Sequence, residues 1–259
     1  METNKPLLKV ESVSITFGGL KAVSDINIEI NKSELIGLIG PNGAGKTTFF
    51  NLLTGVYEPT DGIILLDGKR INGLAPYQIT RKGISRTFQN IRLFNELSVL
   101  DNVKVAYHSN AKHGIFSSML RLPSHFKGER EMEKEAIDFL KIFNLDPYLY
   151  EKAKNLPYGQ QRRLEIARAL ATKPSLLLLD EPAAGMNPQE TEELMNLISF
   201  IREKFDLTIL LIEHDMQLVM GVCKRIYVLD HGQLIAVGTP SEIQNNPKVI
   251  EAYLGEEVS

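Results

Sequence analysis

The sequence predicts an α/β fold in which helices cover both faces of a mainly parallel sheet. Short apolar segments at 34–39, 175–179 and 208–212 are separated by segments with helical periodicity. Strands that are apolar on both faces are typical of parallel sheets, because helices bury each side. The 259 residues, of which 43% are hydrophobic and 24% charged, have the usual composition of a folded globular protein. This length suits one α/β unit with an insert.

The first part of the chain predicts several strands and a helix. The first two strands alternate apolar and polar residues, which indicates one buried face. The third strand is apolar throughout and ends in a Gly-rich turn, after which residues 46–54 have helical spacing and Gly55 closes the helix. The expected strands are 7–15, 22–30, 34–39, 62–66 and 84–88.

Helical spacing sets residues 91–159 apart from the rest of the chain. We expect a helical insert here, within an α/β lobe formed by 1–90 and 160–240, and a helical tail at 241–259. The chain, 1–259, is then a single domain. The expected helices are 99–107, 117–122, 129–143, 160–171 and 189–204, and a hairpin is expected at 225–237.

Composition argues against several classes of function. A net charge of −3 gives no general basic field, so nucleic acid is not an expected partner. Cys223 is the only cysteine, which excludes an intrachain disulfide and a thiolate metal cluster, and we expect it to be a small buried side chain. The sequence contains neither a signal-peptide core nor a run of about 18 apolar residues. We therefore expect a cytoplasmic protein, and any membrane-spanning part would be another polypeptide.

The Gly-rich turn fits the P-loop pattern, which binds the phosphates of a nucleoside triphosphate. Its glycines let backbone N–H groups converge on phosphate oxygens, and the following helix adds the positive end of its dipole. We expect Lys46 to reach the β- and γ-phosphates of ATP and Thr47 to ligate Mg²⁺. An accidental Gly-rich turn is the alternative, which the strand before and the helix after disfavour. The predicted phosphate-binding residues are Gly40, Pro41, Asn42, Gly43, Ala44, Gly45, Lys46, Thr47 and Thr48.

A second motif, the apolar strand at 175–179 followed by Asp180 and Glu181, matches the Walker B pattern. Strands of such sheets deliver acidic groups at their carboxyl ends. We expect Asp180 to hold Mg²⁺ through water, and Glu181 to polarise the attacking water or accept its proton. An acidic pair that only caps a strand is the alternative, which the P-loop upstream disfavours.

The segment between these motifs indicates which P-loop family the chain resembles. Residues 156–164, LPYGQQRRL, lie directly before a predicted helix and resemble the signature sequence of ATP-binding cassette (ABC) ATPases. Residues 184–187 occupy the position of the D-loop in that family. Further matches are Gln89 in the Q-loop, His214 as the switch histidine and Phe17 as the aromatic that stacks on adenine. The order and spacing of these motifs match the family over nearly the whole chain.

The resemblance implies a P-loop ABC ATPase lobe with a parallel sheet core, an antiparallel β segment and a helical insert. It implies that Gln89 and His214 act with Glu181 in ATP hydrolysis, and that Gln89 also ligates Mg²⁺. Gly159 and Gln160 of the signature are then nucleotide-binding residues. Each residue alone has an ordinary structural explanation, such as a core aromatic or a helix cap, but their joint order favours the family.

Longer phrases narrow the resemblance to the ATP-binding subunits of bacterial high-affinity branched-chain amino acid importers. These phrases are FGGLKAV at 17–23, RTFQ at 86–89, EPAAG at 181–185, IEHDM at 212–216 and NPKVIEAYLG at 246–255. The implied partners are a second copy or a related ABC ATPase, integral membrane permease subunits and, indirectly, an extracytoplasmic substrate-binding protein. The implied location is the inner face of the cell membrane. The alternatives are an ABC ATPase of a lipid or polysaccharide exporter and a non-transport ABC switch.

Three residues depart from the family pattern. The signature serine, whose hydroxyl meets the γ-phosphate across the dimer, is replaced by Pro157, and the glycine that follows it by Tyr158. The D-loop aspartate is replaced by Asn187. Proline offers neither a hydroxyl nor an N–H donor, so we expect nucleotide-driven dimerisation to be weakened. The residues expected to carry out hydrolysis are all retained.

Overall fold

The computed structural model describes residues 5–110 and 123–254 and divides into two compact units. The first unit combines Met1–Gln89 with Ser175–Ser259, and the second is the continuous segment Asn90–Pro174. The second unit extends beyond the insert expected at 91–159, because its last helix packs against its first. The helix expected at 117–122 lies outside the described residues.

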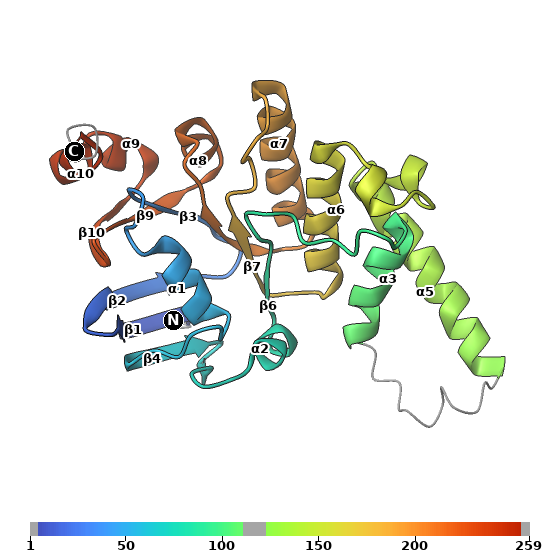
Figure 1. Cartoon of the computed structure of the whole chain (residues 1–259), viewed down its shortest axis with the longest axis horizontal. Coiled ribbons are helices and arrows are strands. Elements are labelled where there is room, and N and C mark those ends of the chain that lie inside the picture. Colours follow the sequence, from blue (N-terminus) through green and yellow to red (C-terminus); the bar gives the residue numbers. More distant parts are fainter. Residues whose placement is uncertain (1–4, 111–122, 255–259) are drawn as a thin grey trace. The chain divides into compact units, whose positions relative to one another are not determined.

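The larger sheet of the first unit consists, among the described residues, of β3 (Leu35–Ile39), β6 (Ile84–Arg86), β7 (Leu176–Asp180), β8 (Thr208–Ile212), β9 (Arg225–Asp230) and β10 (Gln233–Gly238) (Figure 1). Their order is β10-β9-β3-β8-β7-β6. Only the β9–β10 pair is antiparallel within this described sheet. Every residue of β3, β7 and β8 is buried, which agrees with their continuous apolar sequences.

A second, antiparallel sheet of the same unit contains β1 (Leu8–Phe17), β2 (Leu20–Ile30), β4 (Asp61–Leu66) and β5 (Lys69–Arg70). Their order is β2-β1-β4-β5. The α/β class with a parallel core and an antiparallel segment, expected from the sequence, is confirmed.

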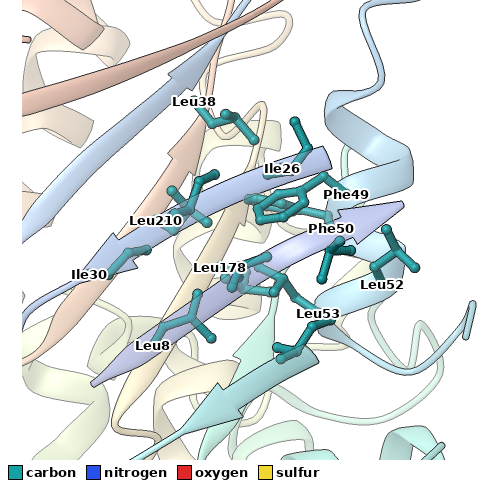
Figure 2. Close-up of a cluster of buried hydrophobic side chains, with 14 of the residues drawn as sticks. Leu8, Ile26, Ile30, Leu38, Phe49, Phe50, Leu52, Leu53, Leu178 and Leu210 are labelled. Carbon is teal, nitrogen blue, oxygen red and sulfur yellow. The ribbon is translucent and has the colours of Figure 1, made fainter. Parts of the chain in front are cut away.

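One hydrophobic core joins the two sheets through helix α1 (Lys46–Leu53) (Figure 2). Phe49 and Phe50 of α1 are fully buried in it. Leu8 comes to this core from the antiparallel sheet, and Leu178 comes from the parallel sheet. Because α1 begins directly after the P-loop, packing of its aromatic side chains fixes the loop relative to both sheets.

The first unit also contains α2 (Pro76–Lys82), α7 (Pro188–Lys204), α8 (Met216–Val222), α9 (Pro240–Gln244) and α10 (Pro247–Leu254). α2 and α8, which are short, were not expected from the sequence. Asn187 is the N-cap of α7, and its side chain accepts a hydrogen bond from the Glu190 N–H at 3.0 Å. The unusual D-loop residue therefore has a local structural role.

The second unit is helical over the residues that the structure describes. Its main helices are α3 (Val99–Asn110), α5 (Pro123–Ile142) and α6 (Tyr158–Ala171), and α3 packs against both others. An ion pair between Arg162 and Glu165, 2.7 Å apart, is completely buried in this unit. None of the helices within 5–110 and 123–254 is long and apolar enough to span a membrane.

Cys223 is buried against β3, as the sequence predicts. The residue is 5% exposed, and burial raises the pKa of its thiol to about 12. A Cβ added at Gly37 of β3 would lie 3.2 Å from the Cys223 Sγ, so the glycine makes room for the sulfur. Thiolates, not thiols, are the reactive form of cysteine.

We therefore predict that a thiol reagent such as DTNB reacts with the folded protein far more slowly than with the protein in concentrated guanidinium chloride. Absorbance of the released thiolate measures both rates. Ser241→Cys, on the exposed start of α9, is the control and should react rapidly in the folded protein. Equal reaction rates for folded and unfolded parent protein would contradict the burial of Cys223.

Candidate active site

The polar groups of the first unit gather at one edge of the larger sheet. Parallel strands place their carboxyl ends along the same edge. The P-loop follows β3, Gln89 lies beyond β6, and Asp180 ends β7. His214 follows β8 at the same edge. The topology thus brings these sequence-predicted residues together within one compact unit.

Two glycines shape the P-loop. Gly40 has a φ of 151°, and a Cβ there would lie 2.0 Å from the Leu229 carbonyl oxygen. Gly45 has a φ of 101° and is the N-cap residue of α1, where no side chain of the described residues caps the helix. A helix start of this kind binds anions through backbone N–H groups and the helix dipole.

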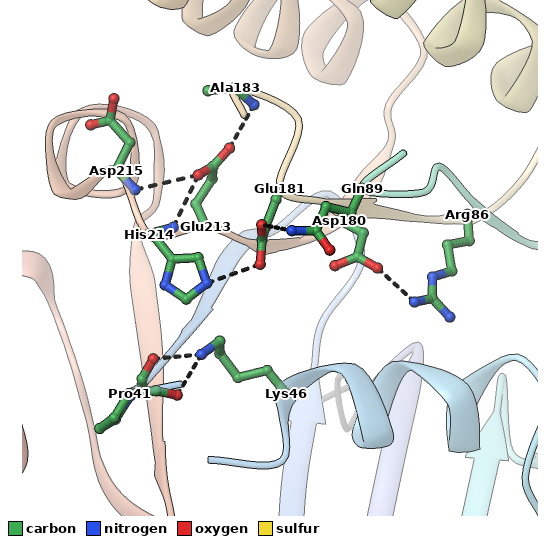
Figure 3. Close-up of polar contacts among 11 residues, drawn as sticks. Pro41, Lys46, Arg86, Gln89, Asp180, Glu181, Ala183, Glu213, His214 and Asp215 are labelled. Carbon is green, nitrogen blue, oxygen red and sulfur yellow. Dashed lines mark hydrogen bonds and ion pairs between the residues drawn. The ribbon is translucent and has the colours of Figure 1, made fainter. Parts of the chain in front are cut away.

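Lys46 is a buried cation held by the loop itself (Figure 3). Its Nζ donates hydrogen bonds to the carbonyl oxygens of Gly40, at 2.5 Å, and Pro41, at 2.7 Å. Both acceptors are neutral carbonyl oxygens. Phosphate oxygens can therefore replace them as the hydrogen-bond acceptors of Lys46. The loop therefore holds the ammonium close to where a phosphate would bind.

A pocket of about 370 Å³ opens beside the P-loop. This volume is at the lower end of the range of about 300–1,000 Å³ usual for small-molecule sites. The lining residues are Leu20, Lys21, Ala22, Asn42, Gly43, Ala44, Gly45, Lys46, Thr47, Thr48, Glu181, His214 and His231. The pocket thus unites most of the predicted phosphate-binding residues with two of the predicted catalytic ones.

Phe17 ends strand β1, opposite Leu20 of β2. The residue is 42% exposed, and its ring packs edge-on against that of Tyr57, with ring centroids 5.1 Å apart. Leu20 lines the pocket, so Phe17 belongs to the hairpin that borders it. An exposed ring at this position can stack on a planar ligand.

The Glu181 carboxylate is held from two sides (Figure 3). Gln89 Nε2 donates to its Oε2 at 2.6 Å, and His214 Nε2 lies 2.9 Å from its Oε1. Because a carboxylate only accepts hydrogen bonds, this contact favours the tautomer in which His214 Nε2 carries the proton. The Glu181 backbone has a φ of 46°, an uncommon conformation that is often found at functional sites.

Glu213 joins the loops that follow β7 and β8. The residue is only 3% exposed. Its carboxylate accepts hydrogen bonds from the backbone N–H groups of Ala183 at 2.6 Å, His214 at 3.0 Å and Asp215 at 3.3 Å. Burial raises the Glu213 pKa, and these hydrogen bonds act in the opposite direction. Glu213 therefore fixes the backbone that carries His214. Sequence reasoning missed this role, although an acid directly after an apolar strand was a visible signal.

The Asp180 carboxylate is paired with Arg86. Arg86 Nη2 donates to Asp180 Oδ2 at 2.6 Å, and the two side chains are only 7% and 5% exposed. Sequence reasoning also missed Arg86, whose signal is a charged residue at the end of a buried strand. Asp180, Thr47 and Gln89, the predicted metal ligands, supply hard oxygen donors that suit Mg²⁺. Over the described residues no cluster of three or more His, Cys, Asp or Glu could hold a metal ion.

Gly159 and Gln160 belong to the second compact unit, where they lie in the first turn of α6. Pro157 is the N-cap residue, with φ −53° and ψ 151°, and its carbonyl oxygen accepts a hydrogen bond from the Gln161 N–H at 3.0 Å. No side chain within the described residues caps this helix either. Proline suits this position, because the N–H that it lacks has no intrahelical partner there.

Comparisons with known proteins agree with this geometry. The family model described as "ABC transporter" matches residues 23–184, and the model described as "Branched-chain amino acid ATP-binding cassette transporter" matches residues 233–259. The crystal structure of the ADP conformation of MJ1267, an ATP-binding cassette of an ABC transporter, is similar with a TM-score of 0.83 and 32% identity. The structural alignment covers 96% of this chain and 99% of the MJ1267 chain.

Two curated relatives span almost the same length as this chain. The high-affinity branched-chain amino acid transport ATP-binding protein LivG of Escherichia coli (strain K12) is 52% identical over 98% of this chain and 99% of LivG. The lipopolysaccharide export system ATP-binding protein LptB of Haemophilus influenzae is 32% identical over 97% of this chain and 98% of LptB. From its motifs, its fold and these matches, the chain belongs to the ABC transporter family, as an ATP-binding ATPase subunit.

Proposed function

We propose that this chain is the ATP-hydrolysing subunit of an ABC importer for branched-chain amino acids. The observation that carries the proposal is the Glu181 carboxylate, held by Gln89 and His214 at a pocket lined by the P-loop. The 52% identity with LivG and the match of residues 233–259 to a branched-chain transporter model support the importer and its cargo.

In this proposal the P-loop binds the phosphates of ATP, and Lys46 exchanges its loop carbonyl partners for phosphate oxygens. Phe17 stacks on the adenine ring. Thr47, Asp180 and Gln89 hold Mg²⁺, which when bound supplies positive charge to the phosphates. The donor chemistry of the three side chains fits this ion.

Glu181 orients the attacking water and accepts its proton. Gln89 and His214 hold one carboxylate oxygen each, so the general base is already positioned before substrate arrives. Glu213 supports this arrangement, because its carboxylate accepts hydrogen bonds from the backbone N–H groups of His214 and Ala183. Hydrolysis then depends on a base whose orientation is set by loops from three neighbouring strands.

We predict that Glu181→Gln lowers the ATPase rate by about 10²–10⁴-fold, because the amide cannot accept the proton of the attacking water. ATP affinity measured by calorimetry should stay close to that of the parent, since phosphate binding belongs to the P-loop. Glu203→Gln, a neutralisation of a side chain that is 72% exposed, is the control and should hydrolyse ATP like the parent. A Glu181→Gln variant with parent-like turnover would falsify the role of Glu181.

We further propose that the chain works as a dimer, with a second copy or a related ABC ATPase, on the inner face of the cell membrane. The family resemblance implies that Gly159 and Gln160 contact the nucleotide bound by the other subunit. Integral permease subunits would carry the amino acid, and an extracytoplasmic substrate-binding protein would deliver it. Pro157 would weaken the ATP-bound dimer, because it supplies no hydroxyl to the partner's nucleotide.

Pro157→Ser, made in the Glu181→Gln background, should tighten the ATP-dependent dimer by about 1–3 kcal/mol for each restored hydrogen bond. Loss of the proline's backbone restraint offsets less than about 1 kcal/mol of this. Sedimentation equilibrium at saturating ATP measures the dimer constant. Pro147→Ser, in the 3-10 helix at Asp146–Tyr148, is the control and should leave the constant unchanged. If Pro157→Ser leaves the dimer unchanged or weaker, the proline is only a helix-start residue.

The competing function is that of an exporter ATPase, which is suggested by the sequence similarity to LptB. The lower identity, 32% against 52% for LivG, and the branched-chain match at residues 233–259 favour the importer. The two functions require different membrane partners, so they can be separated in cells.

Expressed in an Escherichia coli strain that lacks LivG, the chain should restore uptake of radiolabelled leucine at low concentration. The Glu181→Gln variant, produced at the same level, should not restore it. In a strain depleted of LptB, the chain should not support growth. Rescue of the LptB-depleted strain without leucine uptake would show that the exporter reading is correct.

A further inference from the structure

Arg86 is a buried cation at the end of β6, in the first compact unit. Its Nη2 donates to Asp180 Oδ2 at 2.6 Å, and its Nη1 donates to the Asn51 side-chain oxygen at 2.7 Å. The guanidinium also lies over the rings of Phe50, at 5.4 Å, and Phe88, at 5.1 Å. These contacts hold both terminal nitrogens of the guanidinium and place it against two rings, whereas its buried Nε has no hydrogen-bond partner among the described residues.

The contacts of Arg86 connect three segments that the proposed chemistry uses. Asn51 lies in α1, the helix that starts at the P-loop lysine, and Asp180 ends the Walker B strand. Arg86 itself lies three residues before Gln89. A planar guanidinium with rigidly placed donors is suited to hold two oxygen atoms at fixed positions. Lysine, with a single ammonium on a flexible chain, would hold them less precisely.

The charge of Arg86 matters as much as its geometry. Asp180 is 5% exposed at its side chain, and a buried carboxylate without a partner is strongly unfavourable. An uncompensated Asp180 would also repel the negative phosphates of a nucleotide in the neighbouring pocket. Arg86 removes this repulsion before any metal ion arrives.

We propose that Arg86 is a positioning residue that serves as the resident counter-charge of Asp180. It holds one carboxylate oxygen in place and allows the nucleotide to bind whether or not Mg²⁺ accompanies it. The inference rests on the proposed function, because it assumes that nucleotide phosphates and Mg²⁺ share this pocket. It assigns to Arg86, to which the family resemblance gave no role, the control of how strongly nucleotide binding depends on Mg²⁺.

The test is calorimetric binding of ADP, which avoids turnover, with Mg²⁺ and with EDTA. Arg86→Gln should lower ADP affinity in EDTA by about tenfold or more, because Asp180 is then unpaired. With Mg²⁺ the loss should be less than about threefold, because the metal ion takes over the compensation. Arg86→Lys keeps the charge and should stay near the parent in EDTA. Arg81→Gln, at an exposed position on α2, is the control for net charge and should bind ADP like the parent.

The double variant Arg86→Gln/Asp180→Asn separates charge compensation from a purely structural role. It replaces the ion pair by two neutral amides, which proteins tolerate better than one buried charge left alone. Its ADP affinity in EDTA should return to within about threefold of the parent, and its response to Mg²⁺ should be smaller than that of the parent. This measurement also decides the question if Arg86→Gln alone does not fold.

Equal losses of affinity with Mg²⁺ and with EDTA would overturn the inference and leave Arg86 with a packing role. A double variant that binds ADP in EDTA as weakly as Arg86→Gln, or more than tenfold more weakly than the parent, would overturn it as well. If the parent does not bind ADP under either condition, the proposed function fails together with the inference. If the parent binds ADP and only the expected pattern of the Arg86 variants is missing, the inference alone fails.

Discussion

The parallel hydrogen bonding of β3, β8, β7 and β6 is the constraint on which the rest of the first unit depends. In this register Asp180 is aligned with Ile212 at the ends of β7 and β8, and Arg86 is aligned with Leu178. A shift of one residue in any pair would turn every side chain of a strand to the opposite face. Such a shift would also move Asp180 and the residues that follow β8 by one position along the sheet edge. The apolar sequence of the strands thus determines where the polar loops emerge.

Each charged group at this edge has a different kind of partner. Lys46 is held by neutral carbonyl oxygens, Asp180 by a cation and Glu181 by a glutamine and a histidine. The two loop acceptors of Lys46 are therefore neutral and replaceable by phosphate oxygens, whereas the buried Asp180 is paired with a cation. Glu181 is oriented in these contacts by an amide and an imidazole, one at each carboxylate oxygen.

The sequence allowed the strands and the P-loop to be predicted, because apolar runs and glycine spacing are local signals. α2 could not be predicted: it has seven residues and buries only Ile79, too few for helical periodicity to be visible. The second unit ends at Pro174, later than the insert expected at 91–159, because α6 packs on α3, which is distant in sequence.

The roles of Arg86 and Glu213 were missed for a related reason. Their importance depends on neighbours that only the folded sheet brings close, namely Asp180 and Ala183. Phe17, Gln89 and His214 were singled out through a family resemblance, since each alone is an ordinary residue for its position. Residue spacing therefore identified functional residues within a single motif. The contacts between residues from separate strands could be seen only in the three-dimensional structure.

The pairing of β3 also sets the order in which the chain can fold as it is synthesised. β3, near residue 35, pairs with β8 and β9, which begin at Thr208 and Arg225. Its partners therefore leave the ribosome late, and pairing over such sequence separations is slow. The second unit is continuous in sequence, so all of it leaves the ribosome during this interval. Until β8 arrives, Phe49 and Phe50 lack part of their core, so the nascent chain presents an apolar surface of the kind that chaperones bind.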